Sequence, residues 1–160
     1  MKNSDLISAL LQQIEEGYHS KAWHGTNLRG SLRGLSIDQL IWRQSPKRHN
    51  IWEIAVHCAY WKYVVRRRLT GERKGTFPLK GSNFFPRPVE RTVEAWKKDI
   101  RLLDEMHFLL TEEIRNIPPA RLSKSPKGSS YSYLQTISGI AMHDVYHAGQ
   151  IQLIKRLIIR

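Results

Sequence analysis

Cysteine is nearly absent from this chain. Cys58 is the single cysteine among 160 residues, which excludes a disulfide framework and fits a reducing compartment, so we expect a cytoplasmic protein. Long apolar runs are missing as well. Charged and amide side chains interrupt the first eighteen residues, so we expect neither a signal peptide nor a membrane-bound protein. The length and an apolar content of 41% predict one domain with an ordinary core, spanning residues 1–160.

Acidic residues are also scarce. Asp and Glu number 14 against 26 Lys and Arg, a formal net charge of +12. The excess lies in residues 41–80, with 10 basic against 2 acidic residues, and in residues 121–160, with 6 against 1. This charge fits either a solvated face or an anionic partner. Nucleic acid is the weaker alternative, because the sequence has no zinc finger, helix-turn-helix spacing or aromatic RNA-binding platform.

Apolar residues recur every three or four positions through most of the chain, which predicts helices. We expect long helices over about 4–20, 50–70, 93–117 and 133–158. The connection 21–50 should hold one or two short helical turns, and no segment reads as a strand. Four amphipathic helices of this length predict an all-α, four-helix bundle.

The connection between the second and third long helices constrains the topology. Residues 71–89 contain three Gly and three Pro, which end the helix before them. A helix of about 21 residues is about 30 Å long, and this segment can span that distance. We therefore expect a long crossover that leaves these two helices parallel, in an up-down-down-up order.

His143 and His147 are the most informative pair in the sequence. At positions i and i+4 of the last helix they share one face, with their Cβ atoms about 5–6 Å apart. They interrupt a stripe that contains Ile140, Ile151 and Ile154. Imidazole nitrogens buried among isoleucines need polar partners, and a shared metal ion satisfies both. The pair therefore predicts a metal site that needs a third ligand.

His57 is the natural third ligand. It lies at the edge of the inward face of the second helix, and antiparallel packing against the last helix gives the three histidines overlapping heights in a bundle about 36 Å tall. His107 also points inward, but a parallel third helix places it about 25 Å down. We therefore assign His107 to the core and exclude it from the ligand set.

Residues next to these histidines have weaker roles. His24 is either a fourth ligand, a hydrogen-bond partner of a ligand, or a loop anchor. Asp144 and Tyr146 are turned about 100° per residue away from the ligands, so each either orients a neighbour or lies at a polar edge. Cys58 reads as a small buried hydrophobic residue. Phe84, with Phe85, forms a lid, a subunit contact or simple loop packing.

Three segments resemble one known family. They are Asn50-Ile-Trp-Glu-Ile-Ala-Val-His57-Cys-Ala-Tyr-Trp61, His143-Asp-Val-Tyr-His147-Ala-Gly-Gln-Ile151 and Trp23-His24-Gly25, which look like the DinB/YfiT-like family. The resemblance implies a four-helix bundle with a long crossover, a divalent metal held by His57, His143 and His147, and often a homodimer. Relatives often carry an acidic residue beside Trp-Pro in the crossover, whereas this chain has Ser82-Asn83-Phe84-Phe85-Pro86.

Family members with known activity include thiol-dependent S-transferases and a maleylpyruvate isomerase. We therefore expect a metal-dependent enzyme of transferase or hydrolase type that acts on a small molecule. Imidazole suits several ions, so Zn or Ni is favoured, with Fe and Mn as alternatives. A low-molecular-weight anionic thiol attracted by the basic residues around Arg66–Arg68 fits this interpretation. The alternative is a basic nucleic-acid-binding or scaffold protein whose metal is structural.

Overall fold

The computed structural model describes residues 3–158, and that part of the chain is helical and has no strand. The all-α prediction is confirmed. The long helices are α1 (Asn3–Tyr18), α4 (Ile51–Thr70), α5 (Val93–Arg115) and α6 (Tyr133–Ile158), and the short ones are α2 (Leu28–Ser31), α3 (Ile37–Ile41) and a 3-10 turn (Pro119–Arg121). The expected short turns in the first connection are α2 and α3. In this range no helix is long and apolar enough to cross a membrane.

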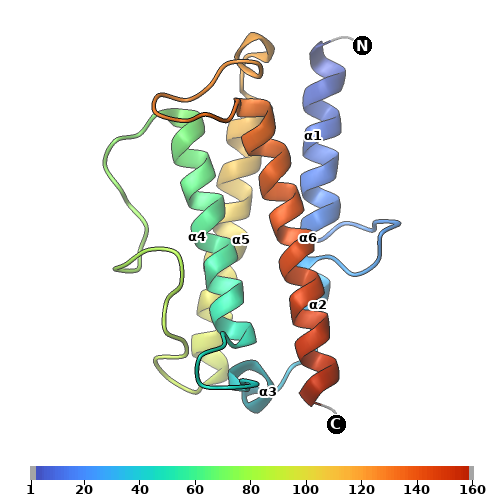
Figure 1. Ribbon diagram of the computed structural model, residues 1–160, viewed down its shortest axis with the longest axis vertical. Coiled ribbons are helices and arrows are strands. Elements are labelled where there is room, and N and C mark those ends of the chain that lie inside the picture. The colour runs from blue at the N-terminus through green and yellow to red at the C-terminus, as the bar shows by residue number, and fades with distance from the viewer. Residues whose placement is uncertain (1–2, 159–160) are drawn as a thin grey trace.

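The four long helices lie side by side (Figure 1). Helix α4 packs against α5 and α6, and α1 packs against α6 and α5. In Figure 1 α4 and α5 run in the same direction, opposite to α1 and α6. The pair α4 and α6 is therefore antiparallel and in contact, which is the arrangement that brings His57 near His143 and His147.

Local capping explains where α4 begins and ends. The Asn50 side chain accepts from the Glu53 backbone N–H, while the Glu53 carboxylate accepts from the Asn50 N–H, so two otherwise unpaired donors are satisfied. Gly71 ends the helix in a left-handed conformation with φ of 77°. Helix α1 ends at Tyr18, before the expected residue 20, because the N–H groups of His19 and Ser20 both bond to the Glu15 carbonyl and the turn unwinds.

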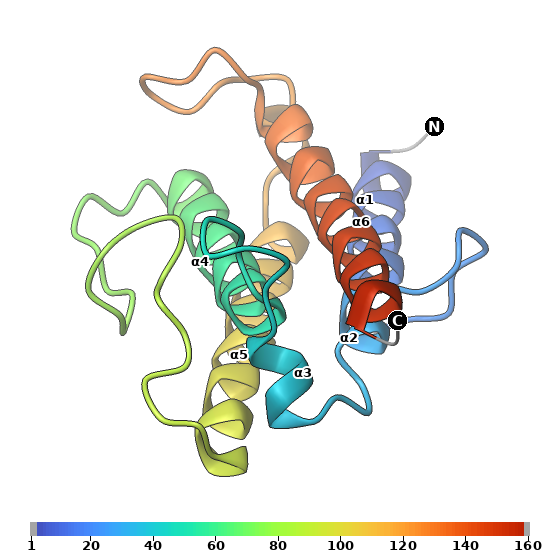
Figure 2. The same cartoon turned by 60° about the horizontal axis from the view of Figure 1, so that its bottom comes forward.

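The crossover between α4 and α5 is a long segment without helix, residues 71–92, slightly longer than the predicted 71–89. Figures 1 and 2 show it beside α4. Phe85 anchors it, because its buried ring lies 5.4 Å, between ring centroids, from both Tyr60 and Phe77. The Phe85 side chain therefore packs into the fold and is not part of a lid.

His107 lies in the core, as expected. The residue is 6% exposed, and its imidazole stacks on the Tyr18 ring with centroids 3.7 Å apart. Burial lowers its pKa to about 2, and the Lys62 and His19 charges add to the shift. His107 is therefore neutral in the folded protein at every ordinary pH.

We predict that this neutral histidine makes the metal-free protein less stable in acid. Below pH about 6.5 the unfolded chain binds a proton at this residue that the folded protein does not. The free energy of unfolding therefore decreases as the pH is lowered, by up to about 1.4 kcal/mol per pH unit. His107→Phe keeps the stacking and removes this contribution. Urea unfolding in EDTA between pH 7 and 4 should give the variant a shallower slope, and equal slopes would contradict the assignment.

Candidate metal centre

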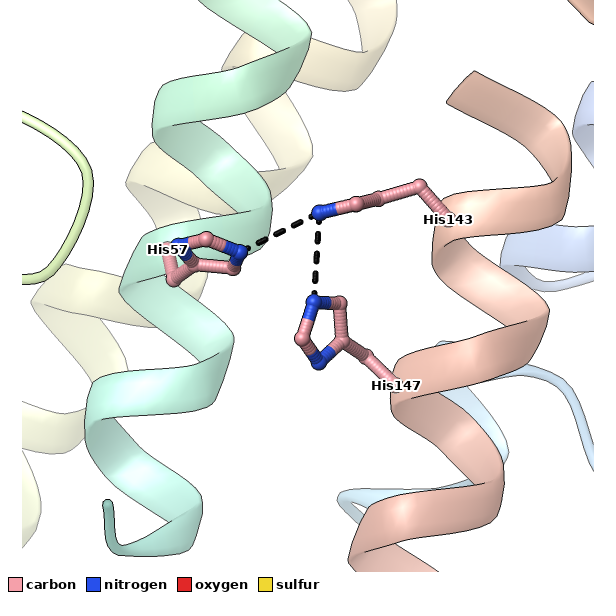
Figure 3. Close-up of side chains that lie close together, drawn as sticks. All are labelled: His57, His143 and His147. Carbon is pink, nitrogen blue, oxygen red and sulfur yellow. Dashed lines mark hydrogen bonds between the residues drawn. The ribbon is translucent and has the colours of Figure 1, made fainter. Parts of the chain in front are cut away.

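Three imidazoles converge between α4 and α6. His57 reaches from α4, and His143 and His147 reach from α6 (Figure 3). The His143 Nε2 lies 3.1 Å from the Nε2 of His57 and 3.1 Å from the Nε2 of His147. The structure thus brings together the three residues that the sequence singled out, and their grouped nitrogens can hold a metal ion.

The outer nitrogens of two of these rings fix where their protons lie. The His57 Nδ1 is 3.0 Å from the Asn83 carbonyl oxygen, and the His147 Nδ1 is 2.8 Å from the Gln150 Oε1. Each of these oxygens only accepts, so each Nδ1 carries the proton and each Nε2 carries a lone pair. Two lone pairs therefore face His143, which can donate only one proton from its Nε2. A cation at this point would relieve the mismatch.

The surroundings keep all three imidazoles neutral. Desolvation lowers the pKa of His57 to about 4 and that of His143 to about 3, and it lowers the pKa of His147 as well. At neutral pH the lone pairs are therefore available to a metal ion without loss of a proton. The neutral state is set mainly by burial, since both His57 and His147 are 5% exposed.

A cavity of about 770 Å³ opens beside the three rings. Apolar and aromatic side chains form most of it, and its polar lining comes from amides, a phenol, histidines and one guanidinium. The lining residues are Trp42, Gln44, Arg48, His49, Ile54, His57, Trp61, Asn83, Phe84, His143, Tyr146, His147, Gln150, Leu153, Ile154 and Leu157. A metal ion held by the histidines would therefore border a space of small-molecule size.

Phe84 and His49 form part of this wall, and sequence reasoning did not place His49 there. The Phe84 ring stacks on His57 with centroids 3.9 Å apart and on His49 with centroids 3.6 Å apart. Of the two phenylalanines only Phe84 lines the cavity, and its ring is in contact with His57. His49 directly precedes the Asn50 cap of α4, and nothing in its spacing pointed to the cavity.

Of the two neighbouring residues considered from the sequence, Tyr146 lies at the cavity and His24 does not. Tyr146 is 62% exposed, lines the cavity and accepts a hydrogen bond from Gln150 through its hydroxyl. It therefore supports the amide that holds His147. His24 is exposed in the loop after α1 and is not among the residues that line the cavity. The structure does not bring His24 to the three histidines.

Asp144 does not lie at a polar edge, because it is fully buried and forms an ion pair with Lys62 of α4. The Lys62 ammonium also lies 4.7 Å from the centre of the Tyr18 ring. Lys62 belongs to the basic excess of residues 41–80, for which a solvated face was one of the two expectations. That placement was wrong, and the position of Lys62 on the same face of α4 as the buried Cys58 was the signal for burial.

Cys58 follows the prediction. Its side chain is fully buried, and burial raises the pKa of its thiol well above the ordinary value. It stays protonated and is therefore a packing residue without nucleophilic character.

A second group, formed by Glu15, His19 and His107, also brings three ligand-type atoms together. The Glu15 carboxylate oxygen lies 2.9 Å from the His19 Nδ1 and 3.2 Å from the His107 Nε2. Two imidazole N–H groups that share one carboxylate account for this geometry, so it requires no ion.

Several other basic side chains of residues 41–80 also bind groups within the protein. Arg43 pairs with Glu53, and Arg66 pairs with Glu72. Arg67 donates to two backbone carbonyls. These contacts leave a smaller free basic surface than the sequence count indicates. The residues Arg66–Arg68 do not line the cavity, so they are not positioned to receive an anionic thiol there.

The described part of the chain is therefore all-helical and has a candidate metal site, where three histidines meet beside a cavity. The family follows from a comparison of sequences. The model of the DinB superfamily matches residues 21–151, and the chain therefore belongs to this superfamily, which confirms the resemblance. Searches of curated proteins and of solved structures returned no match.

The buried ion pair generates a prediction about stability. Lys62→Met leaves the Asp144 carboxylate buried without its partner, which should lower the free energy of unfolding by about 3–5 kcal/mol at neutral pH. The double variant Lys62→Met/Asp144→Asn removes both charges and should recover most of this loss. Chemical denaturation in EDTA checks both. A single variant as stable as the wild type would mean that the pair is solvated.

Proposed function

We propose that the protein binds one divalent metal ion through the Nε2 atoms of His57, His143 and His147. The observation that carries this proposal is the pair of Nε2 lone pairs, fixed by Asn83 and Gln150, that face the third imidazole. Neutral rings with outward Nδ1–H groups are the form in which histidine binds metals. Zn or Ni is our first choice of ion, with Fe or Mn as alternatives.

The site further supports a metal-dependent enzyme that acts on a small molecule. Three protein ligands leave at least one position free, as in catalytic sites and unlike closed structural ones. A bound divalent ion lowers the pKa of a water or thiol that takes this position. The chain supplies the cavity, with Phe84 and Trp61 beside the histidines and with Tyr146 bonded to the Gln150 amide that holds His147. A thiol-dependent transferase or a hydrolase fits this arrangement.

The electrostatics of the cavity favour an anionic substrate. Among its lining residues there is one guanidinium, Arg48, and no carboxylate. A metal ion would add two further positive charges in surroundings of low dielectric constant. Arg48 therefore replaces Arg66–Arg68 as the residue that we expect to select an anionic group.

The finer description of the fold belongs to the same proposal. We infer a single domain, a four-helix bundle of the DinB type in up-down-down-up order, and the parallel α4 and α5 support this topology. The homodimer and the cytoplasmic location stay predictions, as does a structural role for the metal or binding of nucleic acid as the alternative function.

Metal content tests the ligand assignment. Purified wild-type protein loaded with Zn²⁺ and dialysed should retain about one equivalent by elemental analysis, and His57→Ala, His143→Ala and His147→Ala should each retain far less, because two imidazoles bind zinc weakly. His24→Ala is the matched control, since its ring lies outside the cavity, and it should retain the full equivalent. Full retention in any of the three variants removes that residue from the ligand set.

A pair of thiols tests the choice of substrate class. In the Co²⁺-loaded protein, binding of a thiol is read from the charge-transfer absorption. We expect 3-mercaptopropionate to bind several-fold more tightly than 2-mercaptoethanol, because only the first carries a carboxylate for Arg48. Arg48→Met should abolish this preference, while Lys47→Met, whose residue lies outside the cavity lining, should keep it. No preference in the wild type would contradict an anionic substrate.

A further inference from the structure

His143 differs from the other two proposed ligands in its outer nitrogen. The Nδ1 atoms of His57 and His147 each meet an oxygen, whereas the His143 Nδ1 is buried and has no hydrogen-bond partner. A histidine that binds a metal through Nε2 carries its proton on Nδ1, and that N–H needs an acceptor. A buried N–H donor without an acceptor is unfavourable, because it has lost its hydrogen bonds to water.

An acceptor with the same deficiency lies next to it. The Asp144 Oδ1 is buried and has no hydrogen-bond partner. A ring nitrogen of His143, a carboxylate oxygen of Asp144 and the Cys58 sulfur lie within 4.8 Å of one another. The His143 Nε2 is turned to His57 and His147, which leaves Nδ1 as the nitrogen that still needs a partner. Protonated Cys58 is a weak acceptor, which leaves the carboxylate as the stronger partner.

Lys62 determines which carboxylate oxygen is available. Its ammonium binds the Asp144 Oδ2, and its own position is fixed by full burial and by the Tyr18 ring. The carboxylate is therefore held by Oδ2, and its other oxygen, Oδ1, is left without a hydrogen-bond partner. Lys62 also compensates the buried negative charge, which a carboxylate at this depth needs.

We propose that Asp144 is the positioning residue of the metal centre: its Oδ1 accepts the Nδ1–H of His143 when a metal ion binds at Nε2, and Lys62 holds the carboxylate in place. This inference rests on the proposed metal binding and extends it to a buried chain from Lys62 through Asp144 to His143. Each ligand ring then has an oxygen acceptor: a backbone carbonyl for His57, an amide for His147 and a carboxylate for His143.

The test compares two charge-neutral double variants with Zn²⁺ as the probe. Lys62→Met/Asp144→Asn keeps an acceptor oxygen near His143, whereas Lys62→Met/Asp144→Leu removes it. Competition with a chelator of known affinity should give a dissociation constant about 10- to 100-fold weaker for the Leu variant than for the Asn variant. Gln150→Leu is the comparison variant, because it removes the acceptor of His147 and should weaken zinc binding by a similar factor.

Nitrogen-15 NMR of the zinc-loaded wild type gives a second measurement that needs no variant. The His143 Nδ1–H should appear as an exchange-protected signal shifted by a strong hydrogen bond. Equal zinc affinity in the two double variants, or no protected His143 signal, would overturn the role of Asp144. Wild-type protein that binds no zinc would overturn the proposed function itself. If the Leu variant fails to fold, the NMR signal alone decides.

Discussion

The structure depends on three neutral imidazoles that meet where two antiparallel helices touch. The protons of His57 and His147 are committed to oxygens outside the cluster, at Asn83 and Gln150, and burial disfavours protonation of the inner nitrogens. Such an arrangement is unfavourable by itself, because lone pairs face one another in surroundings of low dielectric constant. Close packing of α4 against α6 holds it together, so the site and the helix pair depend on each other.

Sequence periodicity predicted most of this arrangement. Helices α4, α5 and α6 and the group of three histidines follow from spacings of three and four, because one helical turn fixes which side chains share a face. Other residues escaped prediction because no period governs them. His49 and Phe84 belong to loops, and the position of His24 is set by a loop whose path no spacing reveals. The spacing correctly placed Asp144 about 100° around α6 from His143. It did not predict the ion pair with Lys62, because that pair depends on which helix packs against this side of α6.

The polar interior extends beyond the three histidines. Lys62 contacts α6 through Asp144 and α1 through Tyr18, whose hydroxyl donates to Asp104 of α5. The buried Lys62 ammonium is thus part of a network that connects α1, α4, α5 and α6 beside the three histidines. Such a network favours a single packing of the interior, because any slip of one helix would leave a charge or a hydroxyl without its partner.

The acceptor for His57 is a main-chain carbonyl, at a residue whose φ of 64° lies in the left-handed region. The contact between His57 and residue 83 is therefore made by the backbone of residue 83. Substitutions at position 83 should be confined to residues that tolerate this conformation, such as glycine, asparagine and aspartate. The Asn83 side chain adds a second contact, because its Oδ1 accepts a hydrogen bond from the Trp61 Nε1. Glycine at this position would keep the carbonyl contact with His57 and lose only the contact with Trp61.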